Sequence, residues 1–456
     1  MIERLPCVKL IAMVAVSMSL STWARADEQG DRIKALEQRL EANLQLVEKL
    51  AARVAELERA AKLPPSPPVA SSVAQTPPQA QAQAQQAQAL SDLQDSVNQI
   101  SEGLSRRVND TGLPVHGFAD VGAARSTSAD PQRLKGFNIG TFELYLTPQF
   151  GSRVKSLFEL AFEFDQEGHA ELELERLQLG YALSDAVTVW GGRFHTPFGL
   201  WNTSFHHGAN LQTSIFRPRF IDFEDKGGIV PAHSVGVWVT GKTALGPGKI
   251  TYDGYLTNGP RVRDRTLDFN AFTDDNHGKM LGFNLGYQPS GPLNGLTLGL
   301  HGFGSSVDAY STNSSVLSRT RLRAAGGYFG YDASEWEIIA EYYRFANTDE
   351  GTGIRHSSSA WFAQIGKTFG SLTPFARYEQ TSLDPADNYF LSQRAGRSYK
   401  RAVLGVRYAI DARSSFKVEL SNTSESAVVQ VDENGLPVPF PGSSYRRAAF
   451  QYSIAF

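Results

Sequence analysis

The chain has 456 residues, a hydrophobic fraction of 41%, 41 glycines and 11% aromatic residues. Its formal net charge of −3 argues against a nucleic-acid-binding protein, which would carry a strong positive charge. Abundant glycine and aromatic residues favour many strands and turns over a helical bundle.

The first 26 residues have the pattern of an export signal. Basic residues precede an apolar core from Val8 to Leu20, and Ala24-Arg25-Ala26 fits a signal-peptidase site. The single cysteine, Cys7, lies within this signal, so the mature chain would hold no disulfide. No later stretch approaches 18 continuous apolar residues. We therefore expect an exported protein that can cross a membrane only with strands.

Residues 27–62 are predicted to form a coiled-coil helix that self-associates. Apolar residues repeat every seven positions in two series: Ile33, Leu40, Val47, Val54 and Ala61, and then Leu36, Leu50 and Leu57, with Asn43 completing the second series. The narrow stripe with a period of 3.5 favours this structure over an amphipathic helix lying on a membrane. A buried Asn43 would fix the register at some cost in stability.

Two further segments precede the main domain. Residues 63–89 are rich in Pro, Ala and Gln and cannot build a core, so they are predicted to be a periplasmic linker. Residues 90–112 contain a short helical pattern.

From residue 113 to 456 apolar and polar residues alternate, as in Phe142, Leu144 and Leu146, which indicates strands. Segments of this kind are long enough for a tilted strand to cross a bilayer. They predict an all-β, antiparallel transmembrane barrel with about sixteen strands at 115–124, 137–148, 154–165, 171–183, 187–196, 234–242, 249–257, 279–288, 294–304, 319–331, 335–345, 357–369, 372–381, 398–410, 414–425 and 446–456.

The predicted connections alternate in length. Every second one is short, whereas most of the others are long and polar: 125–136, 197–233, 258–278, 305–318, 382–397 and 426–445, with 166–170 as an exception. Sorted loop lengths are typical of outer-membrane barrels. An even strand number returns the last segment, which ends at Phe456, to pair with the first and close the sheet.

Two stretches carry a resemblance to a known family. The last strand, with its terminal Phe456, resembles the closing strand of Gram-negative outer-membrane proteins, which is recognised by the barrel-assembly machinery. The stretch "GGRFHTPFGLWN" (Gly191 to Asn202) looks like the G-x-x-K-x-P-F-G segment of the phosphate-selective (O/P-type) porins, with His195 where that pattern often has Lys. The resemblance implies a trimeric, sixteen-stranded porin, a family in which some members carry an N-terminal coiled coil.

Charged residues opposite the apolar faces of the strands are expected to line the pore. They are Arg193, Arg319, Arg321, Arg323, Arg397, Arg401 and Arg407, and the acidic residues Glu159, Glu163, Asp165, Glu171, Glu173 and Glu175. Two interpretations stay open. These residues could simply be solvated, or they could form a constriction whose basic and acidic walls orient dipolar solutes.

The longest connection, 197–233, is expected to be functional because structureless loops of this length are uncommon. Folded inward, it would place Arg217, Arg219, Asp222, Glu224, Asp225 and Lys226 at the narrowest part of the channel; the alternative is an external loop buried at a subunit interface. His206 and His207 could join Asp222 and Glu224 around a divalent metal. Adjacent histidines on a loop are more often plain polar surface, so we expect no metal and no cofactor.

No G-x-S-x-G elbow, H-E-x-x-H motif or thiol nucleophile is present in the mature chain, so we expect no enzyme. The sequence predicts an outer-membrane porin, a homotrimer surrounded by outer-membrane lipid, that passes small hydrophilic solutes and favours anions such as phosphate or carboxylates. The alternative is a structural barrel whose helical arm, in the periplasm, tethers the membrane to peptidoglycan.

Overall fold

The computed structural model describes residues 115–128, 136–150, 153–164, 170–205, 209–222, 228–268 and 278–456. The predicted signal peptide (1–26), coiled coil (27–62), linker (63–89) and short helical segment (90–112) lie outside these residues. So do His206, His207, Glu224, Asp225, Lys226 and Asp165.

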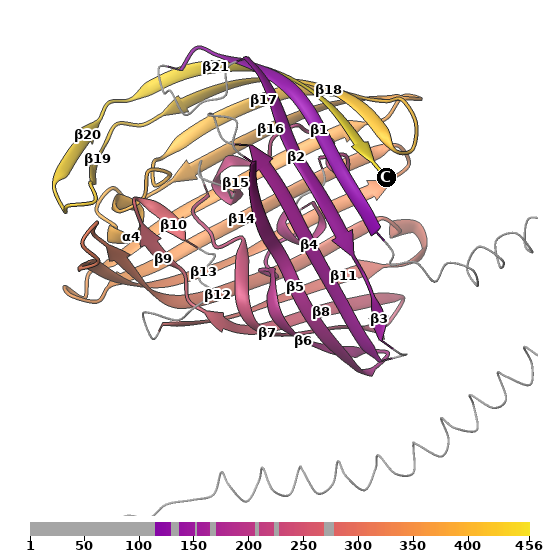
Figure 1. The fold of residues 1–456 in the computed structure, drawn as a ribbon, viewed down its shortest axis with the longest axis horizontal. Coiled ribbons are helices and arrows are strands. Elements are labelled where there is room, and N and C mark those ends of the chain that lie inside the picture. Colours follow the sequence, from indigo (N-terminus) through magenta and orange to yellow (C-terminus); the bar gives the residue numbers. More distant parts are fainter. Residues whose placement is uncertain are drawn as a thin grey trace, which may run out of the picture. The chain divides into compact units, whose positions relative to one another are not determined.

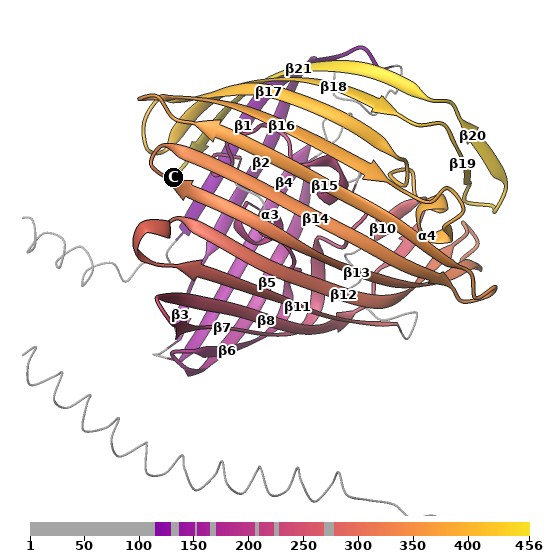
Figure 2. The ribbon, with the colours of Figure 1, turned by 180° about the vertical axis from the view of Figure 1, so that it is seen from behind.

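Sixteen antiparallel strands form the wall of a closed barrel, as predicted (Figures 1 and 2). They are β1 (Val115–Ser126), β2 (Gly136–Leu146), β4 (Val154–Phe164), β5 (Ala170–Ser184), β6 (Val187–His195), β7 (His233–Leu245), β8 (Gly248–Asn258), β11 (Lys279–Pro289), β12 (Leu296–Tyr310), β13 (Val316–Ala333), β14 (Trp336–Asp349), β15 (Arg355–Lys367), β16 (Leu372–Ser382), β17 (Tyr399–Ala409), β18 (Ser414–Glu425) and β21 (Ser443–Ala455).

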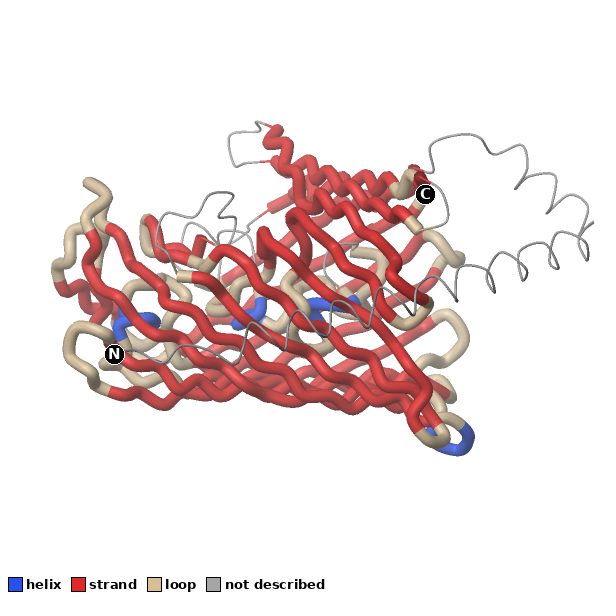
Figure 3. The backbone as a smooth tube through the Cα atoms, turned by 90° about the horizontal axis from the view of Figure 1, so that it is seen from below, coloured by secondary structure: helices blue, strands red, loops and turns tan. Residues whose placement is uncertain are grey.

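The remaining elements are short and lie in connections; Figure 3 shows the short helices in blue. They are β3 (Gln149–Phe150), β9 (Arg261–Arg263), β10 (Thr266–Asp268), β19 (Val428–Val431), β20 (Pro437–Phe440), α3 (Trp201–Ser204), η1 (Arg219–Ile221), η2 (Gly291–Leu293) and α4 (Asn388–Leu391). No helix in the described ranges combines the length and the apolar character needed to span a membrane.

The last strand closes the barrel against the first. β21 pairs with β18 on one side and with β1 on the other, from Phe118 opposite Ala455 to Ser126 opposite Arg447. The backbones of Gly117 and Phe456 exchange two hydrogen bonds of 3.0 Å. A Cβ at Gly117 would lie 2.3 Å from the Phe456 ring, so only glycine leaves room for the terminal aromatic residue. The sheet therefore has no free edge at this junction.

The two ends of the barrel differ in their connections. Ser184–Val187, Leu245–Gly248 and Ala333–Trp336 are joined by two-residue turns at the end that holds Phe456. The opposite end carries 196–232 and 383–398, which are long. The predicted loop 305–318 is wrong, because β12 continues to Tyr310 and β13 begins at Val316. Its polar residues suggested a loop, although Ser305 and Asp308 are buried within a regular strand.

Large apolar side chains point away from the barrel axis along most of the wall. Leu172, Leu179, Val237, Leu256, Leu281, Phe283, Leu298, Leu300, Phe329, Tyr342, Ile365, Leu404, Val418, Leu420 and Phe450 are all exposed. A continuous apolar surface of this extent is unfavourable in water and suits contact with hydrocarbon.

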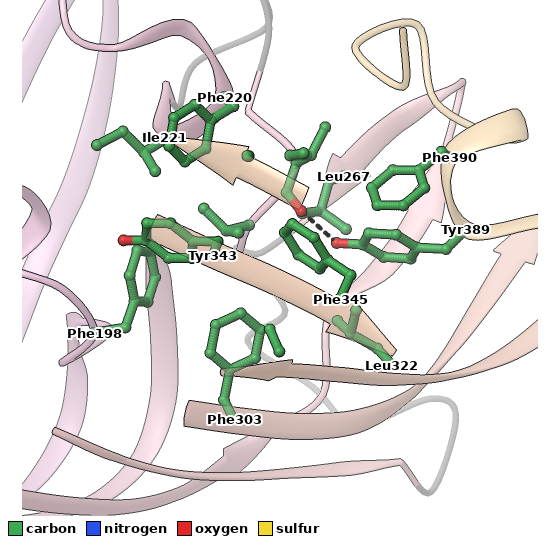
Figure 4. Packing of buried hydrophobic residues seen from close by; sticks show 14 of the residues in the cluster. Phe198, Phe220, Ile221, Leu267, Phe303, Leu322, Tyr343, Phe345, Tyr389 and Phe390 are labelled. Carbon is green, nitrogen blue, oxygen red and sulfur yellow. Dashed lines mark hydrogen bonds between the residues drawn. The ribbon is translucent and has the colours of Figure 1, made fainter. Parts of the chain in front are cut away.

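The interior contains a second apolar surface. Side chains from β6, β8, β11–β15, β17 and the long loops form one buried cluster, which includes Phe198, Phe303, Leu322, Tyr343 and Phe390 (Figure 4). Several strands between β8 and β17 are therefore apolar on both faces.

Candidate pore and its inward loop

The connection 196–232 between β6 and β7 folds into the barrel. Phe198, Trp201 and Phe220 are at most 1% exposed. The Phe198 ring centroid lies 5.6 Å from that of Phe303 on β12, and the Phe220 centroid lies 5.3 Å from that of Tyr343 on β14. The aromatic residues of this loop thus pack against the inner face of the opposite wall (Figure 4).

Three buried carboxylates on the wall accept hydrogen bonds from the loop backbone. The N–H of Leu200 donates to Glu341 at 3.0 Å, that of Ile215 to Glu419 at 3.0 Å, and that of Arg219 to Glu379 at 2.8 Å. Glu341, Glu379 and Glu419 lie on β14, β16 and β18. An irregular loop lacks the regular hydrogen-bond partners of a helix or sheet, and these buried carboxylates supply acceptors for its N–H groups.

Basic wall residues hold the loop carbonyl groups in the same way. Arg377 donates to the Ser214 hydroxyl at 2.9 Å and to the Arg217 carbonyl at 3.3 Å. The Lys417 ammonium donates to the carbonyls of Ala209 and Ser214. The wall therefore binds both N–H groups and carbonyl groups of the loop backbone, and this fixes the path of the loop.

A polar network closes the base of the loop. The Thr196 N–H donates to the Ala232 carbonyl at 2.8 Å. The Asn202 side-chain amide donates to the Thr196 carbonyl at 2.9 Å and to the Ala232 carbonyl at 3.1 Å. Asn202 in turn accepts from Arg217 at 2.9 Å. The stretch Gly191–Asn202 thus includes the end of β6, this base and the start of α3.

The predicted loop residues Arg217 and Arg219 are buried inside the barrel, whereas Asp222 is half-buried at the end of η1. The Arg219 guanidinium pairs with Glu425 and lies 4.8 Å from the Tyr399 ring. Burial lowers the pKa of Arg219, but Tyr445 and Glu425 outweigh it, so this pKa lies above its ordinary value. Glu224 and Lys226 are not among the described residues.

Arg401 and Arg407 also face inward. The Arg401 Nε donates to Thr423 at 3.1 Å, and Arg407 donates to the Asn210 carbonyl of the loop at 3.2 Å. Arg397 lies outside the strands, where it pairs with Glu425 at 3.1 Å.

Arg193 and Glu159 belong to a buried charged cluster where the loop leaves the wall. Arg193 lies 3.3 Å from Glu175, which also contacts His233 at 2.8 Å. Glu159 pairs with Arg176 and lies 3.6 Å from His195. Glu173 lies 4.0 Å from Arg193. Glu163 and Glu171 are in strands, but their side chains are not described.

Arg319, Arg321 and Arg323 do not line the interior, in contrast to the expectation from sequence. Their side chains are exposed on the outward face of β13, while Thr320, Leu322 and Ala324 are buried on its inner face. The expectation assumed that the apolar face meets lipid. Here the inner face is apolar because it packs against the inward loop and the segment around α4.

The carboxylates that anchor the loop were missed from the sequence. Two of them occur in the pattern basic-x-Glu, as Arg377-x-Glu379 and Lys417-x-Glu419. Residues two apart in a strand share a face, so each pattern places an acid and a base together in the interior. This pattern could therefore have predicted the two inward-facing charged pairs from the sequence.

Among the described residues, no group of three or more His, Cys, Asp or Glu side chains could hold a metal ion. The predicted histidine pair lies outside those residues.

Several solved structures are similar to this chain. The loop-deleted outer membrane protein OmpT of Vibrio cholerae aligns with a TM-score of 0.51 and 11% identity, over 76% of this chain and 99% of its own. An anion-selective porin from Comamonas acidovorans aligns with a TM-score of 0.48 and 12% identity, over 76% of this chain and 99% of its own. The outer membrane channel DcaP of Acinetobacter baumannii aligns with a TM-score of 0.46 and 11% identity, over 75% of this chain and 97% of its own.

At such identity the similarity establishes the barrel fold alone. No protein-family model matches the chain, and no curated protein matches it either.

Proposed function

We propose that this protein is an outer-membrane porin that passes small hydrophilic solutes by passive diffusion. The observation that carries the proposal is a polar-anchored loop folded inside a closed barrel whose outer face is apolar. A loop held by buried carboxylates can set the width of an aqueous path, and the outer belt suits lipid.

We further propose that the path runs between the inward loop and the wall formed by β1, β2, β4 and β5. Acidic side chains lie on that wall, whereas basic residues lie on the loop and on β16, β17, β18 and β21. The described members are Asp120, Glu143, Glu159, Glu173 and Glu175 on the acidic side, and Arg217, Arg219, Arg377, Arg401, Arg407, Lys417 and Arg447 on the basic side.

The charges on both sides are partly compensated. Glu379 and Glu425 pair with Arg377 and Arg219 on the basic side, and Arg176 and Arg193 pair with Glu159 and Glu175 on the acidic side. Opposed walls of unlike charge produce a transverse field that orients dipolar solutes. The surplus of basic groups beside the loop supports a bias toward anions such as phosphate or carboxylates, in keeping with the O/P-type porin resemblance of Gly191–Asn202.

The assembly we propose is a homotrimer with the helical arm in the periplasm. One of the similar structures, OmpT of Vibrio cholerae, is described in a trimer form. We also propose that the strand ending at Phe456 is read by the barrel-assembly machinery, and that peptidoglycan is a partner of the arm.

Planar-bilayer recording of the purified chain tests the function. We expect stepwise conductance, and a reversal potential in a salt gradient that moves toward cation preference when Arg401 and Arg407 are both replaced by Ala. Replacing Arg319, Arg321 and Arg323 together should leave that potential unchanged, because these side chains face outward. A larger shift from the outward set than from the inward pair would contradict the assigned path.

One observation favours a second function. The apolar cluster fills part of the interior, as a plug would, and this suits a barrel that anchors the helical arm to the membrane. A correctly folded protein that inserts into bilayers without any conductance would support the anchor and reject the porin.

A further inference from the structure

The outward face of β13, β14 and β15 carries a cluster of arginines. These strands lie side by side in the wall (Figure 2). Arg321 and Arg323 are exposed on β13, Arg344 on β14 and Arg355 on β15. We refer to these four residues as the outer arginine patch.

The strand register brings the patch together. Arg321 lies opposite Thr348, and Thr348 lies opposite Arg355, so the two arginines are two strands apart. At ~4.8 Å between strands, their Cα atoms are separated by about 10 Å. Arg344, opposite Ser359, is on the same face. Long guanidinium side chains from these positions can reach one multivalent anion.

The charge of this surface is only partly neutralised. Neighbouring Arg319 is bound to Asp308, with 2.6 Å between Nε and Oδ1, and Arg321 lies 3.6 Å from Glu350. Within the described part of the chain, Arg323, Arg344 and Arg355 have no carboxylate within ion-pair distance. Arg344 donates to the Ser357 hydroxyl at 3.1 Å, which leaves its charge uncompensated.

The height of the patch points to the lipid head groups. Arg323 precedes Ala333, the end of β13 beside a short turn, by ten residues. At ~3.3 Å per residue and a tilt of ~40°, it lies about 25 Å above that end of the barrel. This is about the height of the apolar band of a membrane barrel. Phe329 and Tyr331 lie on the same face below it, so the face changes from aromatic to basic at the expected boundary.

We propose that the outer arginine patch binds the phosphate groups of an anionic lipid in the leaflet that surrounds the long-loop end of the barrel. Guanidinium groups bind phosphate through paired hydrogen bonds, and arginine is suited to this geometry. Serines and threonine between the arginines, Ser306, Thr348, Ser357 and Ser359, add small hydroxyl groups without bulk. The inference uses the lipid placement of the proposed function but not its conductance.

Native mass spectrometry of the full chain, titrated in detergent with bis-phosphorylated lipid A, tests the inference. Each basic residue near an anionic lipid surface contributes about a factor of five, so Arg321→Ala with Arg323→Ala should weaken binding about thirtyfold. Arg321→Lys with Arg323→Lys should weaken it only a few-fold, because charge remains while the paired geometry is lost. Glu350→Gln should strengthen it.

Lys400→Ala is the matched control. Lys400 is an outward, exposed cation on β17, and its cross-strand neighbours are the uncharged Gln380 and Ser424. Its removal should leave affinity unchanged. An equal loss of lipid A affinity in this control would overturn the inference. So would an unchanged affinity in the double alanine variant, provided that its barrel is folded, as judged by the usual shift in gel migration on heating.

Two further measurements separate the alternatives. Binding of phosphatidylethanolamine as tight as that of lipid A would show that phosphate charge is not what the patch recognises. Dissociation of an oligomer in the double variant, with lipid A affinity kept, would identify the patch as a contact between copies and reject the lipid. Conductance of the same variant is recorded separately. A barrel that does not conduct but still binds lipid A through the patch would reject the porin function and leave the lipid-binding inference intact.

Discussion

Glu341 should hold one segment of the inward loop in place. Its carboxylate accepts from the backbone N–H groups of Leu200 and Trp201 and from the Tyr343 hydroxyl at 2.6 Å, and it is 2% exposed. Removing the carboxylate in Glu341→Ala leaves two loop amides without their acceptor. A hydrogen bond to a charged group contributes about 1.5–3 kcal/mol, so a local loss of about 3 kcal/mol is a conservative figure.

This loss is large enough to open the segment but too small to expel the loop. About 3 kcal/mol changes the ratio of closed to open segment by about 150-fold. Burial of the aromatic side chains of Phe198, Trp201 and Phe220 contributes roughly 2–3 kcal/mol each, which together exceeds the loss. The variant should therefore keep its loop inside the barrel while residues 199–205 fluctuate.

Hydrogen exchange with peptide-level mass spectrometry measures this directly. The peptide that contains Leu200 and Trp201 should lose protection by up to about two orders of magnitude, whereas residues 213–222, which are anchored on Glu379 and Glu419, should keep theirs. Glu350→Gln, an exposed acid on the outside, is the control. Unchanged protection at Leu200, or uniform loss from 196 to 232, would refute the view that each carboxylate anchors its own segment.

The other predictions concern packing, pH and closure. Trp201→Ala empties a fully buried site and should weaken loop docking by about 3–5 kcal/mol, seen as a lower thermal midpoint of the folded barrel in detergent; an unchanged midpoint would contradict it. Burial raises the pKa of Asp387 to about 6, so the docked segment 383–398 gains stability as the pH falls through 6 and loses it as the pH rises; exchange of the Tyr389 amide should show this, and Asp387→Asn should abolish it. Gly117→Ala should reduce barrel assembly, because its Cβ would occupy the space of the Phe456 ring; normal assembly yield would argue against the tight junction.

Much of the wall was predictable because period-two alternation is a local property. The predicted ends of the strand at 414–425 match β18, and those of the strand at 372–381 differ from β16 by one residue. Closure by Phe456 was also predictable, since it follows from strand number and an apolar last segment.

The face that each strand turns inward was harder to predict. Alternation shows that a strand has two different faces but does not tell which of them points into the barrel. On β13 both faces carry apolar residues, with Leu322 inside and Phe329 outside. Its inner face is apolar only because a loop from a distant part of the sequence packs there. A rule that equates apolar with lipid-facing holds where the interior is wet and fails where a loop fills it.

That failure has a functional consequence. The inner faces of β12, β13 and β14 carry apolar residues where the inward loop packs, such as Phe303, Leu322 and Tyr343, so the proposed path lies beside strands whose inner faces are polar. Asp120, Glu143 and Glu159 on β1, β2 and β4 are inner polar residues of this kind. The loop is held by apolar packing on β12–β15 and by charged side chains on β14, β16 and β18. Its arginines Arg217 and Arg219 bind Asn202 and Glu425. In the proposed porin, selectivity would depend on the few side chains that line the path, and the formal net charge of the whole chain, −3, does not describe them.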